Sequence, residues 1–356
     1  DGVDRTSLIR LDSINLNSAA YMGQVGTGSF TLDDTTGVLD VAPLVVASAT
    51  ESAAAQTSLF LGATAERSIQ RGPLRVSTQR QWDVTVEDVN TYLDDRVFAS
   101  LPQNDPLRPN RPAETDVHRA RWAIDRMYVN ANNTTYMPNT NTEPMDRNNY
   151  IGQTVRDVMD DCAQQSGKNY YLFVESGITY CSYDLASATT RTSPLSISDD
   201  PADVDNVTVF APDFSGRPSM IKDPQRLYST IKVRYKHGIV SYVNDATVAA
   251  YRRRDKLKTN MNIKTEAAAK RLARRLQEST DAERTTVNLS VHVPAANATD
   301  ISAGMRVQIK LRHAGITSYI YYRVKTCTLS PRRGNVGVSP DEYTLKLELR
   351  SRILPA

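Results

Sequence analysis

Cysteine is scarce in this sequence of 356 residues, and the three that occur, Cys162, Cys181 and Cys327, are far apart in the chain. An odd number of cysteines without a Cys-x-x-Cys pair argues against a disulfide framework and against a zinc site. We therefore expect free thiols that are mostly buried, as isolated cysteines usually are.

Long apolar runs and catalytic motifs are also missing. The sequence has no stretch of 18 or more apolar residues and no secretory signal pattern at its start, so we expect no membrane-spanning segment. No Gly-x-Ser-x-Gly motif occurs. Gly26-Thr27-Gly28 is not followed by the Gly-Lys-Ser/Thr of a phosphate-binding loop, which favours a simple turn.

The residues that most often carry chemistry are dispersed. The four histidines show no metal-binding spacing: His118, His237, His292 and His313. Paired carboxylates offer general acid or base chemistry as an alternative, but each pair falls in a turn or on the polar side of a predicted helix, where adjacent side chains do not face each other. These pairs are Asp33-Asp34, Asp94-Asp95, Asp160-Asp161 and Asp199-Asp200. We therefore expect no catalytic residue, no metal site and no cofactor.

A large charge excess is absent as well, because 43 Lys and Arg stand against 40 Asp and Glu. This balance does not predict general nucleic-acid binding. The strongest local concentration is a basic run, followed by a predicted helix that adds Arg271, Arg274 and Arg275; the run comprises Arg252, Arg253, Arg254, Lys256 and Lys258. Only Tyr251 could stack on bases there. We favour an interface with acidic groups or a solvated loop, and keep a phosphate-facing channel surface as the alternative.

What the sequence does contain is many strand-like segments. A chain of this length exceeds the roughly 250–300 residues of a single core, so we expect two or more domains. Segments with Gly-rich turns predict a first β-barrel-like domain over residues 1–100. It ends in Gln81–Phe98, where Trp82, Val84 and Val86 alternate with polar residues and the spacing then becomes helical, with Asp88 suited to the N-cap.

Residues 101–220 are expected to form a linker and a small α+β middle domain. Leu101–Pro112 is a proline-rich linker, and Ala113–Tyr128 has helical spacing. A second helix begins with the capping-box pattern of Thr154 and Asp157 and ends at Gly167. Two strands follow and form a hairpin: Tyr170–Val174 and Ile178–Tyr183.

Residues 221–356 are expected to form a second β-barrel-like domain with one inserted helix. Tyr228–Tyr235 and Ile239–Val243 flank a hairpin turn, and Thr265 suits the cap of a helix that runs to Glu278. Four later strands complete the domain: Thr285–Val293, Met305–Leu311, Tyr319–Cys327 and Tyr343–Leu349. The predicted fold class is therefore mainly β with α+β insertions.

Three segments in this order resemble the hub family of phage tail-tip proteins. They are FTLDDTTGVLDV with SLFLG and the Trp82–Leu93 transition; the helix and hairpin at Thr154–Tyr183; and YSTIKVRY through KTEAAAKRLARRL to ISAGMRVQIK and YTLKLELRS. This family comprises minor tail proteins of siphophages and is related to the baseplate hubs of contractile tails and type VI secretion systems. The resemblance spans most of the chain and consists of packing patterns.

The resemblance implies two β-barrel-like tail-hub domains and a homotrimer whose ring has pseudo-sixfold symmetry. Such a hub adapts a sixfold tail to a threefold tip, contacts the distal tail protein ring and the tape-measure protein, and lets DNA pass through its channel. The implied location is the virion tail tip, after assembly in the host cytoplasm. Many relatives carry a further C-terminal region, which we expect to be absent or on another chain. The alternatives are a hexameric distal tail protein, a fibre-attachment module and a cell-wall-degrading tail enzyme.

Overall fold

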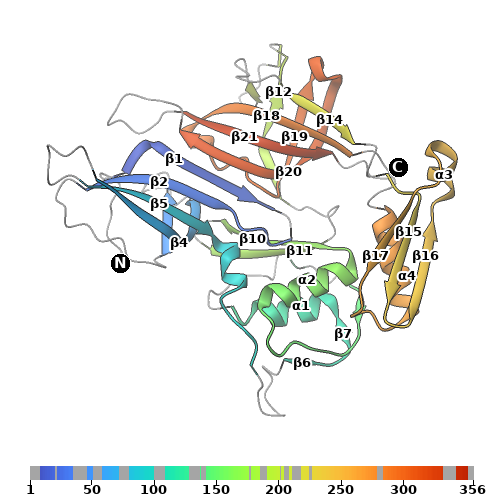
Figure 1. Ribbon diagram of the computed structural model, residues 1–356. Coiled ribbons are helices and arrows are strands. Elements are labelled where there is room, and N and C mark those ends of the chain that lie inside the picture. Colours follow the sequence, from blue (N-terminus) through green and yellow to red (C-terminus); the bar gives the residue numbers. More distant parts are fainter. Residues whose placement is uncertain are drawn as a thin grey trace.

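The protein, seen in a computed structural model, consists mostly of β-strands, with helices gathered in its lower half and at one side (Figure 1). The structure describes residues 9–20, 22–34, 46–50, 58–71, 80–99, 109–127, 137, 142–175, 178–184, 191–200, 202–203, 208–210, 218–223, 227–278, 284–331 and 342–351. The predicted fold class, mainly β with α+β insertions, is confirmed.

The N-terminal strands form one antiparallel sheet. Its order is β1 (Ile9–Ala19), β2 (Thr27–Asp34), β5 (Arg80–Asp88), β4 (Ser58–Arg71) and β3 (Val46–Thr50). Val84 and Val86 of β5 are buried, as their alternation with polar residues predicts. The side chain of Trp82 lies outside the described part of the chain, so its predicted core position stays a prediction.

The helical spacing after β5 produces only one short turn. Asp88 is the N-cap of the 3₁₀ helix η2 (Val89–Leu93), and its side chain accepts the backbone N–H of Asn90. The helix ends at Leu93, well before Phe98, because residues 97 and 98 pair with the middle unit. Phe98 donates its N–H to the Gln153 carbonyl, and Val97 forms a β-bridge with Thr154.

The C-terminal strands form a second group. Along hydrogen-bonded neighbours its order is β13 (Thr208–Phe210), β12 (Thr192–Ser198), β19 (Arg306–Leu311), β20 (Ile316–Pro331), β21 (Glu342–Ser351), β18 (Arg284–Pro294) and β14 (Ser219–Asp223). Among the described residues this path is open, with no ladder between β13 and β14. The strands β12–β14, which the division by sequence assigns to the middle region, therefore pair with later strands, and the boundaries at residues 100 and 220 stay predictions.

Strand β1 joins the two groups. It pairs with β2 on one side and with β20 on the other, from Leu16 opposite Leu329 to Ala19 opposite Thr326. The two groups consequently form a single 12-stranded sheet and share one apolar core. That core packs Leu16, Leu32 and Val86 with residues of the C-terminal strands, such as Val324 and Leu347.

The middle unit packs two helices on a hairpin. It contains α1 (Asp116–Ile124), α2 (Val155–Ser166), β10 (Asn169–Glu175), β11 (Ile178–Asp184) and two short pairs, β6 (Asn110–Arg111) with β9 (Asn148–Asn149) and β7 (Glu114–Thr115) with β8 (Pro144–Met145). The predicted capping box of Thr154 and Asp157 is present, and Gly167 ends α2 with φ of 72°. Both predicted strands of the hairpin are also confirmed.

The insertion between β14 and β18 is larger than the single helix predicted from the sequence. It is an α/β unit of residues 227–278, here called the basic unit, with β15 (Thr230–Tyr235), β16 (Gly238–Val243), α3 (Asp245–Tyr251), β17 (Asp255–Thr259) and α4 (Glu266–Glu278). The sheet order is β16-β15-β17. Ile231, Val233 and Val240 pack against Leu272 and Ala273 of α4, so the unit has its own core and stands beside the helical layer (Figure 1).

A buried amide connects the N-terminal sheet to the middle unit. Asn90 accepts the N–H of Leu172 at 2.8 Å, donates to the Leu172 carbonyl at 3.1 Å, and donates to the Asp88 carboxylate. The Asp88 carboxylate packs directly against Gly26, where a Cβ atom would lie only 2.6 Å from Asp88 Oδ2. Burial raises the pKa of Asp88 to about 7, against the opposing effect of its hydrogen bonds to Asn90.

We predict that Asp88 makes stability depend on pH. Its pKa rises from 3.8 in the unfolded chain to about 7 in the folded chain, so folding favours the protonated form and this contribution to stability is lost as pH rises from about 4 to 7. The Asp88→Asn variant stays neutral and keeps a good N-cap residue. Urea titrations from pH 4.5 to 8 should show it gaining up to about 4 kcal/mol relative to wild type. A difference that does not vary with pH would contradict the prediction.

Candidate functional site

The basic run lies at one edge of the basic unit. Arg252, at the C-terminus of α3, has φ of 95°, and the chain then turns into β17. Ser229 anchors the turn, because its Oγ accepts the N–H of Arg254 at 2.7 Å while its own N–H bonds to the Arg254 carbonyl. The parallel pairing of β17 with β15 then places Lys256 and Lys258 beside Ile231 and Val233.

The cations of the run differ in their surroundings. Arg254 and Lys256 lie over the Tyr228 ring, at 5.5 and 5.0 Å from its centroid. Arg253 and Lys232 both pair with Asp255, and the hydrogen bond from Lys232 lowers the pKa of that carboxyl group. For Arg252 and Lys258, the described part of the chain has no carboxylate within ion-pair distance.

The arginines of α4 have a different role from the run. Arg271 pairs with Glu143 of the middle unit at 2.8 Å, and Arg275 pairs with the same carboxylate and also donates to the Ser166 carbonyl at the end of α2. These two side chains attach the basic unit to the middle unit and do not extend the basic run. Arg274 is exposed.

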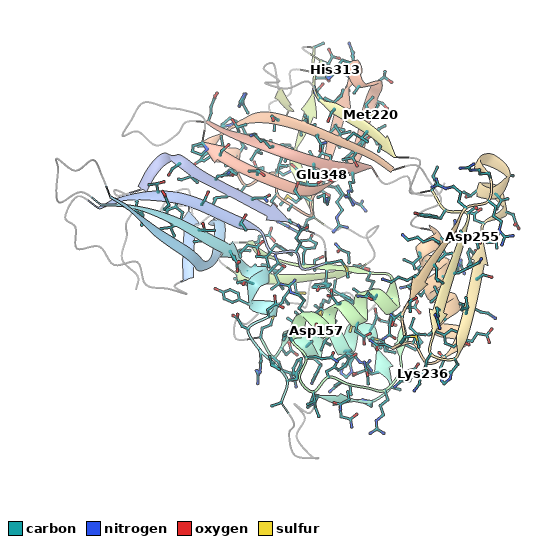
Figure 2. The ribbon with its side chains drawn as sticks, viewed as in Figure 1. Asp157, Met220, Lys236, Asp255, His313 and Glu348 are labelled. Carbon is teal, nitrogen blue, oxygen red and sulfur yellow. The ribbon has the colours of Figure 1, made fainter. Side chains whose placement is uncertain are left out.

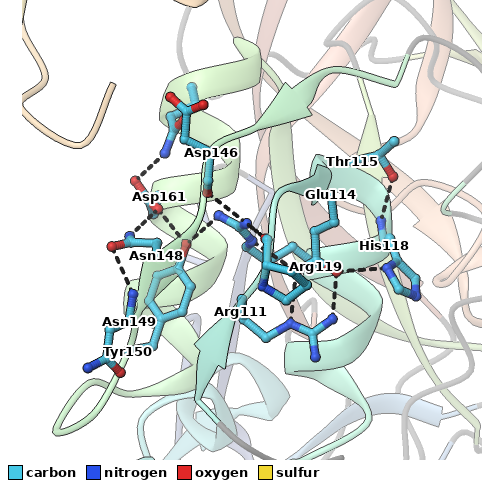
Figure 3. Close-up of polar contacts among 12 residues, drawn as sticks. Arg111, Glu114, Thr115, His118, Arg119, Asp146, Asn148, Asn149, Tyr150 and Asp161 are labelled. Carbon is cyan, nitrogen blue, oxygen red and sulfur yellow. Dashed lines mark hydrogen bonds and ion pairs between the residues drawn. The ribbon is translucent and has the colours of Figure 1, made fainter. Parts of the chain in front are cut away.

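A hydrogen-bonded network in the middle unit continues this attachment (Figure 3). Arg119 is fully buried and donates to Glu114 at 3.1 Å, to Tyr150 Oη at 3.1 Å and to two backbone carbonyls. Tyr150 donates to Asp161 at 2.6 Å, and Asp161 accepts from Asn262 of the basic unit at 2.8 Å. The network thus runs from α1 through α2 to the basic unit.

The charge of the chain is divided unequally between its parts. The basic unit contains 13 Lys and Arg but only four Asp and Glu, a formal charge of +9, whereas the whole chain carries +3. The rest of the chain is therefore net acidic. The balanced total composition concealed this separation, which a charge count by segment would have found.

The outer face of the basic-unit sheet, opposite α4, exposes apolar side chains among cations. Ile239 and Leu257 are 59% and 56% exposed, on the two edge strands. The register places Arg234 beside Ile239 and Lys232 beside Leu257. We call Lys232, Arg234, Ile239 and Leu257 the basic face. The predicted hairpin of Tyr228–Tyr235 with Ile239–Val243 accounts for Arg234 beside Ile239, but the parallel pairing that brings Leu257 beside Lys232 joins separate segments and has no signal in the sequence.

The other candidate residues are distributed over separate places. The four histidines contact four different groups: Glu114 for His118, Tyr235 for His237, Thr344 for His292 and Asp199 for His313. Asp94 pairs with Arg156, Asp160 accepts from Tyr170, and Asp200 pairs with Lys310. The side chains of Asp33 and Asp34 lie outside the described residues. The three cysteines are buried and free, as predicted.

No group of three or more His, Cys, Asp or Glu side chains in the described part of the chain is arranged to hold a metal ion. None of the helices described there is long and apolar enough to cross a membrane.

Comparison with known proteins gives the fold. The sequence matches no protein-family model and no curated protein. Solved structures do match: a 43 kDa prophage MuSo2 tail protein from Shewanella oneidensis (TM-score 0.61, 10% identity, 95% of this chain and 94% of that chain) and a tail protein from Neisseria meningitidis (0.58, 14%, 96% and 92%). A third is an E. coli type VI secretion component similar to the T4 tail proteins gp27 and gp5 (0.51, 8%, 98% and 74%).

The chain therefore has the fold of these phage tail proteins over nearly its whole length. The resemblance inferred from the sequence is confirmed at the level of the fold, which is what likeness at such low identity shows.

Arg119 is predicted to be the residue on which the middle-unit network depends. Replacing it by Met removes the donor to Tyr150 Oη and to two buried backbone carbonyls, and leaves Glu114 with Arg111 as its remaining arginine partner. The free energy of unfolding should fall by about 3–5 kcal/mol in urea titrations. Arg119→Lys should restore little, because one ammonium group cannot reach all four acceptors. His118→Ala is the control: it contacts the same Glu114, but its side chain is 70% exposed, so about 1 kcal/mol or less is expected. Equal losses for Arg119→Met and His118→Ala would contradict the prediction.

Proposed function

We propose that this protein is a structural virion protein that forms the central hub of a phage tail tip as a homotrimer. The hub joins the sixfold tail, through the distal tail protein ring, to a threefold tip. Its channel surrounds the end of the tape-measure protein and later lets DNA pass. The protein acts without catalysis and without a cofactor.

The observation that carries this proposal is the presence of two β-strand groups in one continuous sheet, joined through β1 and β20. Three copies of a chain with two such groups present six β units to a neighbouring ring, which is what a threefold component needs in order to match a sixfold one. The matched folds of tail proteins, and of a type VI secretion component, support the same role.

The basic run is assigned to an interface in this proposal. Arg253, Arg254 and Lys256 contact Asp255 or Tyr228, so an ordered polar surface fits them better than a free loop. The alternative, a channel surface facing DNA, predicts that neutralising Arg252 and Lys258 leaves the ring intact and slows DNA ejection. The interface role predicts weaker ring formation instead.

The proposal predicts that the purified full-length chain forms a particle of three times its 39.5 kDa mass. Light scattering with size separation, or native mass spectrometry over a concentration series, measures this directly. A stable hexamer would favour a distal tail protein. A chain that stays monomeric at every concentration tested, including the high concentrations that apply within a virion, would contradict the proposed ring.

A further inference from the structure

A second surface has the same design as the basic face but the opposite charge. It lies where η2 meets the N-terminus of α2, and it exposes Val97 (58%) and Ile151 (48%). Asp94, Asp95 and Asp157 are exposed beside them. We call these five residues the acidic patch. They form one continuous surface, because Val97 bridges to Thr154 and the backbones of Phe98 and Gly152 are hydrogen-bonded.

The carboxylates of the acidic patch repel one another. Burial raises the pKa of Asp95, and the charges of Asp94 and Glu87 raise it further. The two nearby arginines are already bound within the subunit: Arg156 to Asp94 and the Asn90 carbonyl, and Arg96 to the Arg126 carbonyl. Asp94 is thus already paired, whereas among the described residues Asp95 and Asp157 have no ion pair, so a cation from outside the subunit would be attracted to these two carboxylates.

The two surfaces lie at opposite ends of α2. Arg156, in its first turn, holds Asp94 of the acidic patch, whereas Ser166, in its last turn, accepts Arg275 of the basic unit. A helix of 12 residues is about 18 Å long. In Figure 2, Asp157 marks the helical layer, while Asp255 and Lys236 mark the two ends of the basic-unit sheet at the side of the molecule. The surfaces are too far apart to meet within one subunit.

We propose that the basic face of one subunit docks on the acidic patch of a neighbouring copy of the same chain. This inference rests on the proposed ring and names the contact that closes it. Each surface has two exposed apolar side chains beside charges that are mostly of one sign, with Asp255 beside Lys232 and Arg156 beside Asp94 as the opposite charges. The contact therefore has an apolar centre, and Arg234 faces Asp95 or Asp157 as the complementary charge around it. Two different surfaces at opposite ends are also what head-to-tail association into a closed ring requires.

The apolar pairs supply affinity in this arrangement, and the charges supply orientation. Single exposed ion pairs contribute about 0–1 kcal/mol, so Lys232 and Arg234 alone would not hold a ring together. Placing Ile239 and Leu257 against Val97 and Ile151 removes four exposed apolar side chains from water. The charges prevent like surfaces from pairing, which excludes a symmetric dimer through either surface.

The test uses charge reversal in the full-length chain. One variant, Lys232→Glu/Arg234→Glu, reverses the basic face; the other, Asp94→Lys/Asp95→Lys, reverses the acidic patch. Each alone places like charges across every contact and should reduce the particle from three chains to one at concentrations where wild type is trimeric. The four substitutions combined in one chain restore opposite charges and should restore the trimer.

Mixing the two double variants adds a diagnostic that depends on an odd ring. A contact between the two variants is complementary in either direction, but a contact between identical variants is repulsive. Three subunits cannot alternate around a ring, so an equal mixture should stop at an open heterodimer, whereas a ring of two or six would close. Arg147→Glu/Lys270→Glu, at exposed sites outside both surfaces, changes the net charge by the same amount as the reversed basic face and should stay trimeric.

The outcomes separate this inference from the proposed function. Wild type that is monomeric throughout overturns the ring itself. If wild type is trimeric and both charge-reversed variants remain trimeric, the docking is overturned but the proposed ring is not. A loss of affinity for a DNA duplex in the variant with the reversed basic face would not change that conclusion. If circular dichroism shows that a double variant is unfolded, Leu257→Ser and Val97→Ser test the same surfaces. Each substitution should raise the dissociation constant of the trimer at least tenfold. An unchanged dissociation constant overturns the docking.

Discussion

The pairing of β1 with β20 is the constraint on which the fold depends. These strands meet across more than 300 residues of chain, with Leu16 opposite Leu329. Their four paired positions turn two separate β groups into one sheet and place Leu16, Leu32 and Val86 in the same core as the C-terminal strands. Because this contact cannot form before the end of the chain is made, the two β groups are expected to become a single body late in folding.

The other junctions of the molecule use buried polar groups in place of a shared apolar core. Asn90 bonds both backbone groups of Leu172, and Asp161 links Tyr150 to Asn262 of the basic unit. A hydrogen bond is satisfied in one geometry only, so such links fix the orientation between units that have separate cores. The proposed ring would need this precision, because a small error in the orientation of each subunit would prevent the ring from closing.

Charge is distributed among these units in a way that suits assembly. The basic unit is held to its own subunit by Arg271 and Arg275 of α4, which leaves the cations of the opposite sheet face directed outward. The carboxylates of the acidic patch lie at the other end of α2. The proposed hub and the proposed contact between its subunits both rest on this separation of charge and on the two joined β groups.

The sequence by itself determined the local elements. Thr154, Asp157 and Gly167 fixed both ends of α2, and the alternation around Val84 and Val86 fixed β5, because caps and side-chain periodicity depend on a few neighbouring residues. Only the tertiary structure decided which strands pair. It assigned β12–β14 to the C-terminal group, made residues 227–278 a separate unit, and placed Leu257 of β17 beside Lys232 of β15. Those results depend on contacts between distant segments, which leave no periodic pattern in the chain.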